Sequence, residues 1–183
     1  MTTPLFDRAF GITIGHEGDF SDHAEDSGGA TRYGITEAVA RANGYVGPMN
    51  VLPYSLARTI AYAQYWKQNR LDEVGAISNK LALELFDTGY NMGIGTAAQY
   101  LQRCLNAFNR AQRDYPDVKV DGILGNSTLY ALKRFMAVRK QDGETVLLRA
   151  VNALQGAGYI SITQNREKDE KFVFGQFLNR VAM

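Results

Sequence analysis

Apolar residues recur at every fourth position in the first segment of the chain. These residues are Phe6, Phe10 and Ile14. They define one face of a helix for which Thr3 is a suitable N-cap and Pro4 a suitable first residue. Glu17 continues the same face and Gly18 ends it. The pattern therefore predicts a helix over residues 4–17 with a carboxyl group at the end of its buried face.

The rest of the chain also has mostly helical patterning. Thr36, Ser78 or Asn79, and Thr96 are candidate helix starts. Helices are predicted over residues 36–43, 55–68, 79–91, 96–113, 128–139, 144–155 and 166–181. Strand signals are limited to a short hairpin around residues 33–35. The predicted fold class is mainly α, with two closely packed helical lobes and at most a short β-hairpin.

Composition narrows the classes of protein that fit this pattern. The 183 residues are 45% hydrophobic, enough for one sizeable core or two small lobes. The formal net charge of +1 argues against a nucleic-acid-binding protein, which usually has a basic surplus. No apolar run approaches membrane-spanning length, and Asp7 and Arg8 interrupt the amino-terminal apolar segment, so we expect no cleavable signal. Cys104 lies among apolar residues at helical spacing, which predicts a buried thiol.

Acidic, glycine and hydroxyl residues crowd the segment that follows Glu17. A carboxyl on an apolar face favours its protonated form, which is the form that a general acid needs. Asp26 lies in a turn-rich stretch and can supply a second carboxylate, as glycosidases commonly require. Thr31, Tyr33 and Thr36 can orient a water molecule or a sugar. Two alternatives stay open, because Asp26 could hold an Asx turn and Thr31 could simply brace the loop.

Metal chemistry is the competing reading of this segment. His16 and His23 are the only histidines, and they lie close to several carboxyl groups. Their spacing differs from the paired histidines of zinc peptidase helices, so no metal or cofactor is expected. Trp66 and nearby tyrosines could stack on sugars, but their helical spacing favours core packing.

The segment Glu17-Gly18-Asp19-Phe20, followed by residues 26–36 with the sequence Asp-Ser-Gly-Gly-Ala-Thr-Arg-Tyr-Gly-Ile-Thr, resembles the signature of glycoside hydrolase family 108. Members are lysozyme-like N-acetylmuramidases of bacteriophages and bacteria. The resemblance implies that Glu17 is the catalytic acid. The spacing from Glu17 to Asp26 is also similar to that in the Glu, Asp and Thr triad of phage-type lysozymes, although Thr31 falls one residue early. The chain departs from the family pattern at Asp19, Phe20 and Ser27, which bears on substrate preference.

Two later blocks extend the resemblance over nearly the whole chain. Residues 85–93 are similar to a family segment that closes a helix across the cleft, which implies that Tyr90 and Asn91 contact sugar. Residues 120–129 look like the turn and helix of peptidoglycan-binding modules. The expected organisation is a lysozyme-like catalytic region over residues 1–95 and a helical peptidoglycan-binding-like region over residues 96–183, packed against it.

The expected function is cleavage of the β-1,4 bond between N-acetylmuramic acid and N-acetylglucosamine in peptidoglycan. The expected partners are glycan strands, with no nucleic acid, no stable membrane insertion and a monomeric state. A chain without a signal would be made in the bacterial cytoplasm and reach the wall through a holin or another release route. The alternatives are a non-catalytic wall-binding module and, less favoured, a zinc-dependent peptidase or amidase. Retention or inversion depends on carboxyl separation and stays open.

Overall fold

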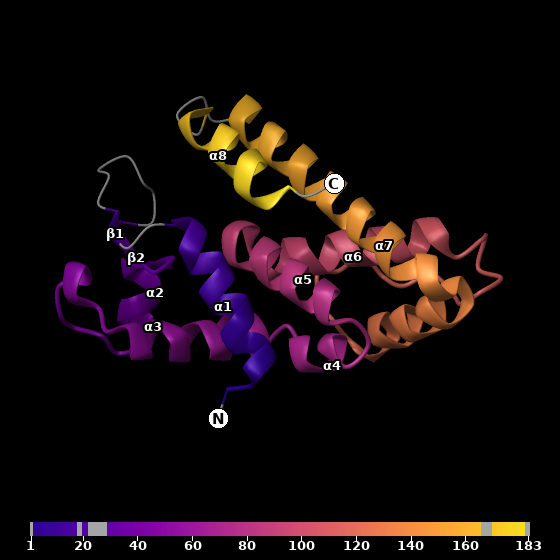
Figure 1. Ribbon diagram of the computed structural model, residues 1–183, viewed down its shortest axis with the longest axis horizontal. Helices are drawn as coiled ribbons and strands as arrows, with labels where there is room; N and C mark the ends of the chain where they lie inside the picture. The colour runs from indigo at the N-terminus through magenta and orange to yellow at the C-terminus, as the bar shows by residue number, and fades with distance from the viewer. Residues whose placement is uncertain (1, 18–19, 22–28, 166–169, 182–183) are drawn as a thin grey trace. The chain divides into compact units, whose positions relative to one another are not determined.

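The computed structural model describes residues 2–17, 20–21, 29–165 and 170–181 (Figure 1). The chain forms two compact units, Met1–Asp72 and Glu73–Met183. Helices dominate both units, and the described strands form one small three-stranded antiparallel sheet. The predicted fold class is confirmed. The boundary between the two compact units lies between Asp72 and Glu73. The expected division into a catalytic region ending at residue 95 and a binding region after it stays a prediction.

The first unit combines the amino-terminal helix with the sheet and the helices that follow. Its elements are α1 (Pro4–Glu17), β1 (Phe20–Ser21), β2 (Thr31–Arg32), β3 (Ile35–Thr36), α2 (Glu37–Ala42), the 3-10 helix η1 (Met49–Val51), α3 (Tyr54–Ala61) and the π-helix η2 (Tyr62–Lys67). The short helix α4 (Leu71–Gly75) spans the boundary of the two units. The single helix predicted over residues 55–68 is thus an α-helix that continues into a π-turn.

The buried face of α1 follows the true helical period. Phe6 and Phe10 are fully buried, and the next buried position is Thr13, while Ile14 is half-buried. A strict four-residue repeat drifts around a helix of 3.6 residues per turn, so the buried face shifts from Ile14 to Thr13. Glu17, the last residue of α1, lies one turn beyond Thr13.

A chain of aromatic ring contacts runs from the core of the first unit to its surface. Phe6 stacks on Phe10 with centroids 5.7 Å apart, and it meets the edge of Trp66 at 5.6 Å. Phe10 packs on Tyr54 at 5.5 Å, and Tyr54 meets Tyr33 edge to face at 5.4 Å. Trp66 is fully buried and its indole nitrogen donates to Asp72 at 2.8 Å, so core packing is its role, as its spacing favoured.

The second unit is built from long helices. They are α5 (Asn79–Met92), α6 (Ile94–Phe108), α7 (Asn126–Asn165) and α8 (Glu170–Arg180), and Figure 1 shows α7 as the long orange helix. The core of this unit lies where α5 packs against α6 and α7. Ser78 caps α5 by accepting from the Leu81 amide at 3.0 Å, as predicted.

Several helix boundaries differ from the sequence prediction, and the largest extension is that of α7, which runs to Asn165, ten residues beyond the predicted end at 155. α6 begins at Ile94 after Gly93, so Thr96 lies within its first turn and is not its cap. α6 ends at Phe108, because Asn109 turns the chain and accepts from the Gln112 amide, with residues 110–112 at positive φ. The two helices expected over 128–155 are continuous apart from a break at Lys140, where φ is 51°. Non-local packing decides these ends, since the local signals allow several.

A buried glutamine organises the turn that leads into α7. The Gln102 amide nitrogen donates to Asp121 at 2.9 Å and to the Ile123 carbonyl at 3.0 Å, and its oxygen accepts from the Gly122 amide at 3.0 Å. Gly122 has φ +77°, and a Cβ there would lie 3.1 Å from the Gly95 carbonyl oxygen. Asp121 therefore shapes this turn.

Candidate active site

In the first unit, the small sheet begins directly after the end of α1. α1 ends at Glu17 and β1 begins at Phe20, so only two residues separate the candidate acid from the first strand. The side chain of Glu17 and the whole of Asp26 lie outside the described residues. Their assignment as catalytic acid and second carboxylate therefore stays a prediction.

Three hydroxyl residues form a row across one face of the sheet. Ser21 pairs with Thr31 across β1 and β2, and Thr31 pairs with Thr36 across β2 and β3. Directly opposed residues of an antiparallel sheet point to the same face. The opposite face carries Phe20, Arg32 and Ile35, and Ile35 is fully buried. Phe20, by contrast, is 44% exposed, so only the β3 end of that face is buried, and the hydroxyl row of Ser21, Thr31 and Thr36 is half-buried along its length.

Ser21 is a member of this row that the sequence reading missed. Strand β1 has only two residues, too few for an alternating pattern to announce it. Thr31 is half-buried, and its hydroxyl lies 3.4 Å from the Gly29 carbonyl oxygen. The row can donate and accept hydrogen bonds, which suits a sugar or an ordered water.

Tyr33 lies in the two-residue turn that joins β2 to β3. The register pairs Arg32 with Ile35, and both turn residues have positive φ, 51° for Tyr33 and 74° for Gly34. This combination is typical of the type I′ turns that connect hairpins. The Arg32 guanidinium lies 4.9 Å from the Tyr33 ring centroid. A bulky residue in the left-handed region costs energy, and such strain concentrates at functional sites.

Thr36 has a structural role as well as a place in the hydroxyl row. Its hydroxyl oxygen accepts from the Val39 amide at 3.4 Å and caps α2, as predicted. The next residue, Glu37, forms an ion pair with Arg41 at 2.7 Å. Arg32 donates from its guanidinium to the Asn50 carbonyl, which ties the hairpin to the segment before α3. These contacts anchor the hairpin to α2 and to the segment before α3.

The predicted sugar contacts Tyr90 and Asn91 belong to the second unit, at the end of α5. Tyr90 is only 9% exposed, and its ring stacks on Phe86 with centroids 5.3 Å apart. Asn91 is half-buried, and its amide nitrogen donates to the Asp87 carbonyl at 2.8 Å. A sugar could therefore be received by the Asn91 oxygen, whereas the Tyr90 ring contributes mainly to packing. Their roles stay predictions.

A pair of carboxyl groups in the second unit, Glu84 and Asp87, was not anticipated, and both residues are half-buried on α5. Burial raises the pKa of Glu84 from its usual 4.5 to about 7, while hydrogen bonds from Asn152 and Thr88 oppose the rise and the charge of Asp87 adds to it. Asp87 forms an ion pair with Arg180 of α8, and both side chains are largely buried. The signal available in the sequence was a pair of acids inside an otherwise apolar helix.

The single cysteine and the possible metal ligands have no predicted role in catalysis. Cys104 is 4% exposed, and burial raises the pKa of its thiol to about 11, which confirms an inert buried cysteine. Within the described ranges, His, Cys, Asp and Glu side chains form no group of three that could hold a metal ion. Across the same ranges, no helix is long and apolar enough to cross a membrane.

Comparisons with known proteins agree with this architecture. Residues 10–93 match the family model for glycosyl hydrolase 108, and residues 96–181 match that for a predicted peptidoglycan domain. The fold is similar to that of Brucella abortus SagA, with a TM-score of 0.65 and 22% sequence identity over 97% of this chain and 96% of that one. A search of curated proteins found no match.

The two matched segments place the chain among peptidoglycan-acting, lysozyme-like glycoside hydrolases. The hydrolase match ends at residue 93, directly after α5, and the peptidoglycan match begins at residue 96 in the first turn of α6. α5 therefore belongs to the hydrolase match, although it lies in the second compact unit. The chain thus carries a glycosyl hydrolase 108 domain over residues 10–93, joined to a predicted peptidoglycan domain over residues 96–181.

Proposed function

We propose that the protein is a muramidase that hydrolyses the β-1,4 bond between N-acetylmuramic acid and N-acetylglucosamine. The observation that carries this proposal is the glycosyl hydrolase 108 match over residues 10–93, which includes Glu17 and the hydroxyl row. The peptidoglycan domain match supports glycan strands as the polymer that the protein engages. The first unit would carry the chemistry, because Glu17 and the sheet belong to it.

Glu17 acts in this proposal as the general acid that protonates the leaving glycosidic oxygen. Asp26 positions or activates water, or stabilises positive charge at the anomeric carbon. Thr31 holds that water or the sugar through its hydroxyl, and Ser21 and Thr36 extend the same polar face. Tyr33 lines the site beside the Arg32 guanidinium. An oxocarbenium-like transition state is stabilised by a carboxylate, which Asp26 supplies in this proposal.

The biological setting that we propose is wall degradation by an endolysin-type enzyme. The enzyme acts as a monomer, is made in the bacterial cytoplasm and reaches peptidoglycan through a holin or another release route. Sedimentation of the purified chain and fractionation of producing cells test these two points independently of catalysis.

The decisive experiment is Glu17→Gln, assayed on purified peptidoglycan with mass spectrometry of the soluble fragments. The amide retains the shape of the side chain but cannot donate the proton, so turnover should fall about 10²- to 10⁴-fold. Asp142→Asn is the matched control, since Asp142 is exposed and belongs to the second unit. Near-normal turnover of Glu17→Gln would remove the general-acid assignment.

The products separate the competing functions. A muramidase releases fragments with new reducing N-acetylmuramic acid ends, and a strong chelator leaves its rate unchanged. A wall-binding module sediments with peptidoglycan but releases nothing. A zinc peptidase releases amines and stops when the chelator is added.

A further inference from the structure

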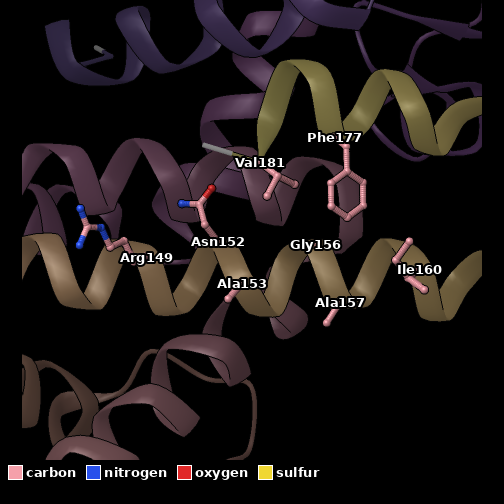
Figure 2. Close-up of a pocket in the computed structure, with 8 residues that line it drawn as sticks. All are labelled: Arg149, Asn152, Ala153, Gly156, Ala157, Ile160, Phe177 and Val181. Atoms are coloured by element: carbon pink, nitrogen blue, oxygen red, sulfur yellow. The ribbon is translucent and has the colours of Figure 1, made fainter. Parts of the chain in front are cut away.

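A groove of about 570 Å³ lies between α7 and α8 in the second unit. Figure 2 shows Phe177 of α8 above the α7 helix, with Ile160 at one end of the groove and Arg149 at the other. Small residues, Gly156 and Ala157, occupy the middle of the α7 side. This volume falls in the range of small-molecule sites, which are usually apolar with a few polar groups.

Gly156 sets how closely α8 approaches α7. A Cβ at Gly156 would lie 3.3 Å from the Phe177 ring and 3.4 Å from a methyl group of Val181. α8 thus packs closely against α7 at Gly156, and apolar side chains of the groove remain partly exposed. Phe177 is 38% exposed and Ile160 is 44% exposed. An apolar ligand in the groove would remove this surface from water and stabilise the complex.

The polar end of the groove is cationic. Arg149 is exposed, and in the described part of the chain no hydrogen bond or ion pair engages its guanidinium. Beside it, the Asn152 amide donates to the Leu148 carbonyl at 3.1 Å. Arg149 is the one charged side chain among the residues that line the groove. A guanidinium of this kind pairs well with a carboxylate or a phosphate.

We propose that this groove binds a single long acyl chain with an anionic head group. The head pairs with Arg149, and the chain runs along Ala157 towards Ile160 and Phe177. Arg149 and Ile160 lie eleven positions apart in α7, which corresponds to about 16 Å of helix and accommodates an extended chain. A sugar fits poorly, because its hydroxyl groups would lose water in a lining with few polar partners. This lipid-binding role is additional to glycan cleavage and does not depend on it.

The full-length protein is titrated with dodecanoate by calorimetry, with butanoate as the head group without the chain. We expect one dodecanoate per protein and no measurable butanoate binding over the same range. Arg149→Gln should weaken binding about tenfold, and Ala157→Phe, which fills the groove from an exposed position, at least tenfold. Lys133→Gln, an exposed cation elsewhere on α7, should leave the affinity unchanged. Circular dichroism shows whether each variant is folded.

Several results would overturn the proposal. Equal affinity in wild type and Ala157→Phe would place the ligand elsewhere, and equal affinity in Arg149→Gln would remove the anionic head group. Binding to phosphatidylglycerol vesicles without binding of free dodecanoate would indicate a membrane surface instead of a single-chain site. A dimer in sedimentation that Ala157→Phe dissociates would show that a second copy fills the groove. Peptidoglycan turnover, measured in parallel, reports on the proposed glycosidase activity separately.

Discussion

Thr31 lies directly opposite Thr36 across β2 and β3, so their hydroxyl-bearing side chains share one face of the sheet. Ser21 extends this row from β1. The two threonines differ in what else they do, because the Thr36 oxygen already accepts from the Val39 amide that it caps. Substitutions at the two positions should therefore separate catalysis from stability.

Thr31→Val should reduce peptidoglycan turnover about 10- to 100-fold with little change in thermal stability. Valine retains the β-branched shape that suits a strand but lacks the hydroxyl that holds water or sugar. Thr31→Ser retains the hydroxyl and should keep most of the activity. The measurement is reducing-end release per enzyme at saturating substrate. If Thr31→Val is as active as wild type, Thr31 only supports the hairpin.

Thr36→Ala should destabilise the first unit by about 1 kcal/mol, because the amide at the start of α2 loses its side-chain acceptor. Thr36→Ser should restore most of that loss. Chemical denaturation followed by circular dichroism measures both. A change in turnover at a temperature well below the melting transition would show that Thr36 also contacts substrate. An unaltered free energy of unfolding in Thr36→Ala would show that the cap contributes nothing.

The raised pKa of Glu84 predicts how stability depends on pH. The folded state holds the Glu84 proton up to about pH 7, whereas the unfolded chain releases it near pH 4.5. This contribution to stability is present below pH 4.5 and is lost as pH rises through 7, on the order of 3 kcal/mol in total. Glu84→Gln should flatten the dependence between pH 5 and 8 and raise stability at pH 8. Identical profiles for variant and wild type would contradict the burial of this carboxyl.

The ion pair between Arg180 and Asp87 joins α8 to α5. Arg180→Met removes the cation and leaves the largely buried Asp87 carboxylate without this ion pair. The substitution should therefore lower the free energy of unfolding by about 3 kcal/mol. The double variant Asp87→Asn with Arg180→Met should recover part of the loss, because no charge is then left unpaired. Arg149→Met on α7 is the matched control, since no ion pair within the described chain engages it. A small effect of Arg180→Met would show that solvent compensates.

Truncation after Gly95 should give an insoluble or non-cooperative product. α5 buries Leu81, Leu85 and Phe86 in the unit formed by residues 73–183, and a fragment of residues 1–95 would expose them. Each such side chain contributes about 1.5–3 kcal/mol when buried. The fragment 73–183 should instead melt cooperatively, which calorimetry can test. A soluble 1–95 fragment with a cooperative melt and full activity would contradict this organisation.

Local signals in the sequence were sufficient for the helical class and for several of its boundaries. The caps at Thr36 and Ser78, the start of α1 at Pro4 and the Tyr33-Gly34 turn all depend on contacts within a few residues. Such contacts can be read from composition and spacing because their partners are adjacent in the chain. The family signature could also be recognised from sequence alone, because its residues lie close together in the chain, between Glu17 and Thr36.

Tertiary structure decided the features whose partners are distant in sequence. Burial of Glu84 depends on α5 packing against α7, and the pair of Asp87 with Arg180 joins residues 93 positions apart. The hydroxyl row exists only because three two-residue strands align in one register, which brings Ser21 beside Thr31. No local pattern encodes these relations, since the free energy that selects them comes from burial and pairing across elements, and those appear only when the chain has folded.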